Sequence, residues 1–249
     1  MIDERIFLGF PIEFKDICQI YPPTVNDVCG DKDFLIFQSL MTMTQDDLDD
    51  AYTRENIDTI PTPFQYLMIN CYTSEETTEK VKKGFLKLVH EPITIVPEIE
   101  MLLIGKAEED LDPDIDLENP RLITAENFFD FQNEIRRVMG EKPAEPSEAP
   151  DPDEDPRITR WKRKIKESER LVAKKKNKKG PTFGTMLAAI CCMGIGITPL
   201  NIGEISYACV HWLTAMEQQK EEYDIDIRAL LAGADSKKVK PKYWIKNID

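Results

Sequence analysis

An abrupt reversal of charge divides this chain and limits what it can fold into. Residues 141–156 contain seven acids and one Lys, a net charge of about −6, and residues 157–179 contain twelve Lys or Arg and two Glu, a net charge of about +10. Like charges at this density repel one another and bring too little apolar surface to offset the entropy of ordering. The sequence therefore predicts two folded parts joined by a polar connection.

The remaining composition suits a protein of ordinary domain size. The chain has 249 residues, 41% hydrophobic, and a net charge of −14. The charge outside the two stretches, about −18, lies almost wholly before Gly140. This predicts a mainly α fold in three parts. Residues 1–140 form an acidic, mainly helical α+β domain with a small sheet, residues 141–180 an acidic-then-basic linker or helix, and residues 181–249 a helical C-terminal unit with one long helix.

Apolar residues three and four apart indicate helices in the first part. We expect helices from about 31, from Thr44, from Thr62, from Ser74 and from Thr124, the last one ending at Gly140. Three short apolar runs, 92–96, 99–104 and 121–123, predict a sheet of two or three strands. The stripes that would face a core include Phe34, Phe37, Leu40, Phe64, Leu67, Val81, Phe85, Leu88, Phe128, Phe131 and Ile135.

The C-terminal part predicts two helices, 182–193 and a long one from Thr198 or Asn201 to Leu231. The long helix would span roughly 45 Å, more than a unit of this size can cover. Ile205, Leu213 and Met216 recur at near-heptad spacing and are candidates for a surface that binds a partner or a second copy. The alternative is that this stripe is ordinary core.

The basic stretch admits three interpretations. It can bind an acidic protein surface, of which this chain has its own supply before Gly140, it can be a solvated helix, or it can contact nucleic acid. Arg160, Trp161, Arg163 and Lys164 are its candidate binding residues, with Trp161 as a stacking ring. One aromatic residue among about 23 residues is weak support for nucleic-acid binding, so nucleic acid is not the expected partner.

Nothing in the sequence predicts catalysis, a cofactor or a metal site. The chain has two histidines, His90 and His211, and six cysteines without a CxxC pair, which we expect to be reduced and mostly buried. No basic leader with an apolar core opens the chain, and no apolar run approaches the ~18 residues of a membrane span. We therefore expect a non-enzymatic cytoplasmic protein that does not contact membranes.

The layout of the chain resembles the tail assembly chaperones of long-tailed phages of Gram-positive hosts. The resemblance rests on Thr62-Pro63-Phe64, on the segment Asn-Phe-Phe-Asp-Phe-Gln-Asn at 127–133, on the basic connection, and on the C-terminal segment Leu-Leu-Ala-Gly-Ala-Asp-Ser-Lys-Lys-Val-Lys-Pro-Lys-Tyr-Trp-Ile at 230–245. It covers most of the chain, and none of these motifs has a catalytic meaning.

The resemblance implies an assembly factor that coats the long, helix-prone tape measure protein in the host cytoplasm and recruits tail tube subunits. Phe128, Phe131 and Ile135 would then support the first domain, and the C-terminal helix would self-associate or bind a viral partner. Two alternatives remain at this point. One is a structural virion component, such as a connector or baseplate piece, and the other is a nucleic-acid-binding regulator that acts through the basic segment.

Overall fold

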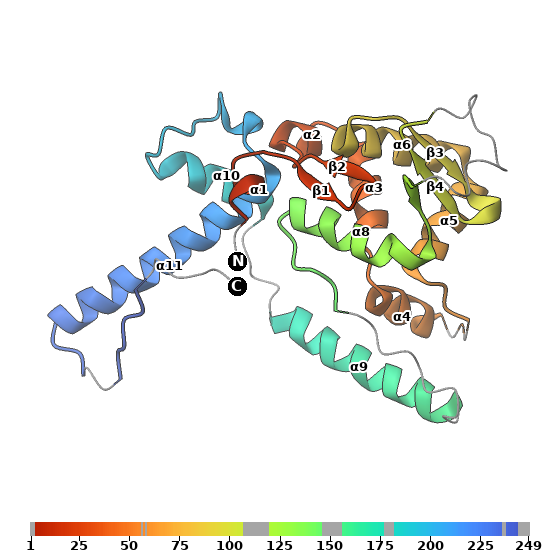
Figure 1. The fold of residues 1–249 in the computed structure, drawn as a ribbon. Coiled ribbons are helices and arrows are strands. Elements are labelled where there is room, and N and C mark those ends of the chain that lie inside the picture. The colour runs from red at the N-terminus through yellow and green to blue at the C-terminus, as the bar shows by residue number, and fades with distance from the viewer. Residues whose placement is uncertain are drawn as a thin grey trace.

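The computed structural model describes residues 3–55, 57, 59–106, 120–145, 156–176, 182–235 and 238–243. Within these ranges the chain is mainly helical, as the sequence predicts, and has two small antiparallel sheets, of which the sequence predicts one (Figure 1). The helices are α1 (Glu4–Phe7), α2 (Val25–Cys29), α3 (Lys32–Thr42), α4 (Gln45–Arg54), α5 (Pro63–Thr73), α6 (Glu75–Val89), α8 (Ala125–Val138), α9 (Pro156–Lys176), α10 (Phe183–Cys192) and α11 (Tyr207–Leu231). The strands are β1 (Ile12–Phe14), β2 (Cys18–Ile20), β3 (Ile93–Val96), β4 (Met101–Ile104) and β5 (Leu122–Ile123).

Three helix starts in the first part follow the predicted capping residues. The side-chain oxygens of Thr44, Thr62 and Ser74 each accept a hydrogen bond from the backbone N–H three residues later, at 3.1 to 3.2 Å. Such a cap satisfies one of the backbone donors that a helix leaves unpaired at its N-terminus. The predicted starts of α4, α5 and α6 are therefore confirmed.

The predicted stripes of α3, α5, α6 and α8 are the faces that form the main core. Phe131 contacts the rings of Phe14 and Phe85, with centroids 5.1 and 5.9 Å apart, and Phe85 packs edge-on against Phe37 at 5.0 Å. Gly84 lets α6 approach α3 closely, since a Cβ at this position would lie 2.1 Å from Cγ of Phe37. Aromatic contacts thus join both ends of the N-terminal part.

The predicted sheet contains three antiparallel strands in the order β3-β4-β5. The strand predicted to begin at Ile99 begins instead at Met101, because Pro97–Ile99 forms a 3-10 turn, η1. Glu100 closes that turn in the left-handed region, at φ 48°. A second sheet, the β1-β2 hairpin, lies beside α8 (Figure 1). It packs Phe14 against Phe131 of the core.

The C-terminal unit contacts the first part of the chain. Gly140 ends α8 at φ 73°, as predicted, and a Cβ there would lie 2.9 Å from Cα of Ala208 in α11. The backbone N–H of Val25 donates to the carbonyl of Ile205 at 3.0 Å, and that of Tyr207 donates to the carbonyl of Pro23 at 2.7 Å. The three predicted parts, 1–140, 141–180 and 181–249, remain a prediction, and these contacts join the first to the last.

The predicted start of the long helix at Thr198 or Asn201 is wrong. Residues Ile202–Glu204 form a 3-10 turn, η3, and the helix begins at Tyr207, where the hydroxyl of Ser206 accepts from the N–H of Cys209 at 3.2 Å. Ile205 is extended, and its carbonyl accepts a hydrogen bond from the N–H of Val25, the first residue of α2. The spacing of apolar residues does not predict this long-range contact. The predicted end at Leu231 is confirmed.

No helix in the described ranges combines the length and the apolar character needed to cross a membrane. Of the six cysteines, which are all free, Cys18, Cys71 and Cys209 are buried, whereas Cys29 and Cys192 are exposed. Burial raises the pKa of the Cys18 thiol to about 12 and the pKa of the Cys209 thiol to about 11. The buried thiols therefore stay protonated at neutral pH and act as small apolar side chains.

Candidate binding surfaces

The basic helix α9 docks on the acidic helix α4 of the same chain. Arg170 places one guanidinium nitrogen 2.5 Å from the carboxylate of Asp46 and the other 2.8 Å from the carboxylate of Asp50, forming a fork across two acids one turn apart. Asp50 is only 5% exposed, and its carboxylate accepts a hydrogen bond from Arg170 in place of water. A planar guanidinium suits such a two-pronged contact better than an ammonium group does.

Two peripheral ion pairs extend this contact. Lys166 lies 3.1 Å from Asp46, and Glu167 accepts from Arg54 at 2.7 Å. Burial would raise the pKa of the Asp46 carboxyl, but hydrogen bonds from Lys166 and Arg170 outweigh it and hold this pKa below its ordinary value. The acidic surface that the basic segment meets thus belongs to its own chain, which was one of the three interpretations of that segment.

The four basic-segment candidates remain a prediction. Trp161 and Lys164 are exposed and Arg163 is half-buried, whereas the side chain of Arg160 lies outside the described residues. The ion pairs with α4 come instead from Lys166, Glu167 and Arg170. The sequence signal for these residues is their spacing of three and four, which places them on one helix face.

The three C-terminal candidates do not share a helix face. Ile205 precedes α11, and both Ile205 and Leu213 pack against a small cluster of Val25, Ile190, Ile202 and Val210. Met216, one turn beyond Leu213, is half-buried. Ile205 and Leu213 are therefore already engaged within the chain, and their role toward a partner remains a prediction.

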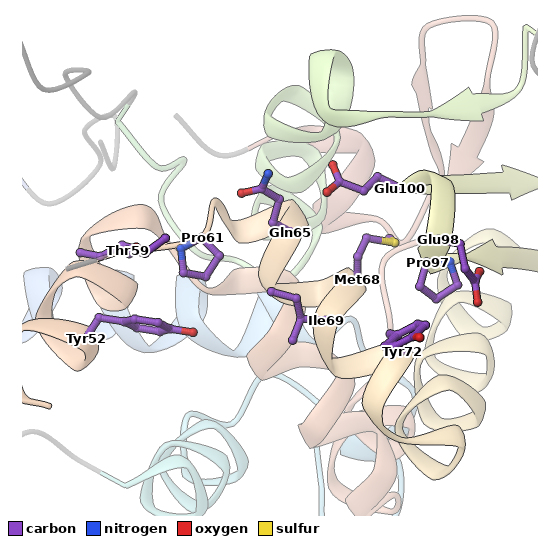
Figure 2. A pocket seen from close by; sticks show the side chains of 11 residues that line it. Tyr52, Thr59, Pro61, Gln65, Met68, Ile69, Tyr72, Pro97, Glu98 and Glu100 are labelled. Atoms are coloured by element: carbon purple, nitrogen blue, oxygen red, sulfur yellow. The ribbon is translucent and has the colours of Figure 1, made fainter. Parts of the chain in front are cut away.

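A groove between α4, α5 and η1 offers an apolar surface that the sequence did not single out. It encloses about 680 Å³ and is lined by Tyr52, Thr59, Ile60, Pro61, Gln65, Met68, Ile69, Tyr72, Pro97, Glu98 and Glu100. In Figure 2, Tyr52 and Pro61 lie at one end, Tyr72 and Pro97 at the other, and Ile69 between them. Glu98 and Glu100 bring two carboxylates to the Pro97 end.

The sequence did not predict the groove, because its lining comes from segments that are separate in the chain. One local signal existed: Ile69 and Tyr72, three residues apart on α5, lie off the stripe that faces the core and remain exposed. Large apolar side chains on the solvent side of a helix indicate a contact surface when they adjoin a concave patch. Among the described residues no three His, Cys, Asp or Glu side chains lie close enough to hold a metal ion.

Comparison with known proteins extends only to the C-terminal part. Residues 174–249 match the family model described as the YomV second domain. This segment is less than a third of the chain and contains α10 and α11 together with the Lys-rich end that the phage resemblance used. No curated protein and no solved structure matches. The C-terminal part of the chain is thus similar to the YomV second domain.

Proposed function

We propose that this protein is a non-enzymatic tail assembly chaperone of a long-tailed phage, which binds the tape measure protein and recruits tail tube subunits in the host cytoplasm. The observation that carries the proposal is the apolar groove of the acidic N-terminal part, lined by Tyr52, Ile69 and Tyr72 and flanked by Glu98 and Glu100. The similarity of the C-terminal part to the YomV second domain supports the origin in a phage. The resemblance in the N-terminal part supplies the specific role.

The groove suits an amphipathic helix that carries basic residues. Exposed aromatic and aliphatic side chains along α5 would bury the apolar stripe of an amphipathic helix, and the two carboxylates at the Pro97 end would attract Lys or Arg on that helix. A tape measure protein is a long helical chain, so it offers many such segments. Several copies of this protein would then coat one client.

The surroundings of the two histidines support a role without acid–base chemistry. His90 caps α6 in the left-handed region, at φ 61°, and its ring stacks on Tyr21 at 4.0 Å. His211 lies beside Phe183 and Tyr207, with ring centroids at 5.9 and 5.1 Å, and burial lowers its pKa. Both rings have packing partners, which is typical of structural histidines.

Two charged groups in the groove should weaken the binding of the tape measure protein. We expect the double variant Ile69→Glu, Tyr72→Glu to bind the tape measure protein of the same phage at least tenfold more weakly, because apolar contacts are lost and buried charge is costly. Co-expression followed by affinity purification and titration measures the effect. Leu86→Glu on α6, an equally exposed apolar position outside the groove, is the matched control.

Retention of the tape measure protein at wild-type affinity by a folded groove variant would contradict the proposed site. Binding of the wild type to duplex DNA, with an affinity that falls steeply as salt rises, would favour the regulator alternative instead. The contact of Arg170 and Lys166 with α4 argues against that alternative, since these two cations are already paired with Asp46.

A further inference from the structure

Helix α9 directs an apolar stripe away from the body of the protein. Ile158, Trp161, Ile165 and Val172 are 48%, 66%, 40% and 54% exposed. Their spacings of three, four and seven residues place them on one side of the helix. Lys162 and Lys164, both exposed, flank this stripe. An apolar stripe edged by lysines on a helix surface is a typical contact for an acidic amphipathic partner.

The same helix uses its opposite side to dock on α4. Lys166, Glu167 and Arg170, which make the ion pairs with α4, lie about 100° to 180° around α9 from Trp161 and Ile165 at 100° per residue. The docked helix is therefore held by charged contacts and presents its apolar side outward. This arrangement leaves the stripe available while α9 is folded and positioned.

The acidic counterpart lies at the other end of the chain. The last buried residue of α11 is Thr214, and the remaining part to Leu231, about 25 Å at 1.5 Å per residue, projects from the body (Figure 1). This distal half, 215–231, contains five acids and two basic residues. Glu221, Asp224 and Ile225, three and four residues apart, form an exposed face on it.

That exposed face is separate from the contact that the chain's own C-terminal segment makes with α11. The returning segment places the ring of Tyr243 against Tyr223, with centroids 5.8 Å apart. Tyr223 points away from the side on which Glu221, Asp224 and Ile225 lie, at about 100° per residue. The acidic face thus remains accessible.

We propose that α9 of one copy binds the acidic distal half of α11 of a second copy, so that copies associate head to tail. The charges are complementary: Lys162 and Lys164 flank the apolar stripe of α9, while Glu221 and Asp224 adjoin Ile225 on α11. In Figure 1, α9 lies beneath α4 on one side of the molecule and the distal half of α11 projects on the other, so the two surfaces face different neighbours. A head-to-tail contact of this kind produces chains or rings. This inference goes beyond the proposed function and does not require a tape measure protein.

Charge reversal on either surface, followed by mixing, tests the pairing. Lys162→Glu with Lys164→Glu makes a copy whose two surfaces are both acidic, and Glu221→Lys with Asp224→Lys makes a copy whose two surfaces are both basic. By sedimentation velocity, we expect the average mass of the wild type to rise with concentration. Each reversed variant alone should need at least tenfold higher concentration for the same rise in average mass. An equimolar mixture of the two variants should show this rise at the concentrations at which the wild type shows it.

The recovery by mixing separates contact between copies from contact within one chain, because an internal contact gains nothing from a second variant. The matched control, Lys32→Glu with Lys83→Glu, reverses two exposed lysines on α3 and α6 and should associate like the wild type. Circular dichroism checks that every variant is folded. A wild type that stays monomeric throughout overturns the proposal, as does a folded mixture that fails to recover. Capture of the monomeric wild type by anionic phospholipid vesicles would instead assign the stripe to membranes.

Discussion

Replacement of Phe131 with Ala should lower the free energy of unfolding by about 3–5 kcal/mol, the largest effect expected for one residue of this chain. Phe131 is fully buried, at 0% exposure, and its ring contacts Phe14 of the hairpin and Phe85 of α6. Truncation leaves a cavity between two helices and a strand that cannot all collapse into it. Denaturation by guanidinium, followed by far-UV circular dichroism, measures the change.

Phe129 provides the matched control, since it lies two residues earlier on α8 and is 37% exposed. Its replacement with Ala should cost less than about 1.5 kcal/mol because less apolar surface leaves the core. Equal losses for the two variants would mean that α8 is not seated on the aromatic core as described.

Replacement of Arg170 with Ala should release α9 from α4. The variant loses the fork that spans Asp46 and Asp50, and a carboxylate as buried as Asp50 is costly to leave without a partner. Breaking a buried ion pair costs about 3–5 kcal/mol, but here the loss is limited by the free energy of docking, because α9 can detach and rehydrate Asp50. We expect trypsin to cut within α9 at least tenfold faster than in the wild type.

Lys166→Ala is the control for this variant. The side chain of Lys166 is 60% exposed, and such pairs contribute about 0.2–1 kcal/mol, so cleavage should change little. Low pH should mimic Arg170→Ala, since the pKa of Asp46 lies below its ordinary value in the docked state. The stabilisation is present above that ordinary value and is lost as pH falls through the lowered pKa. Unchanged cleavage of α9 in Arg170→Ala would show that other contacts hold the helix.

The spacing of apolar residues and the capping residues predicted the N-terminal helices. Each of these helices caps its own N-terminal backbone N–H groups and buries one apolar stripe. The caps at Thr44 and Thr62 act within three residues, and the stripe containing Phe128 and Phe131 faces the core whatever lies opposite. The strands of the three-stranded sheet were likewise bounded by Pro and Gly, with the exception of the turn at Pro97–Ile99. These features depend on neighbours in sequence.

Apart from that turn, the features that sequence analysis missed depend on residues far apart in the chain. Helix α11 starts at Tyr207, because the carbonyl of Ile205 is bonded to the N–H of Val25, about 180 residues away in sequence. The docking of α9 was open among three interpretations because its charge alone does not name its partner. The groove needed side chains from α4, α5 and η1 to meet. Candidates such as Ile205 and Leu213 were chosen from spacing, which does not distinguish a core face from an exposed one.

Quantification of this protein in assembling and in mature phage particles tests the account most directly. A chaperone acts on the tape measure protein before the tail is complete and then leaves. Mass spectrometry of infected-cell lysates should therefore find the protein with tape measure and tail tube proteins in tail intermediates, and should find it depleted at least a hundredfold, relative to the tail tube protein, in purified virions. Retention in virions at a fixed ratio to the tail tube protein would contradict the account and identify the chain as a structural component.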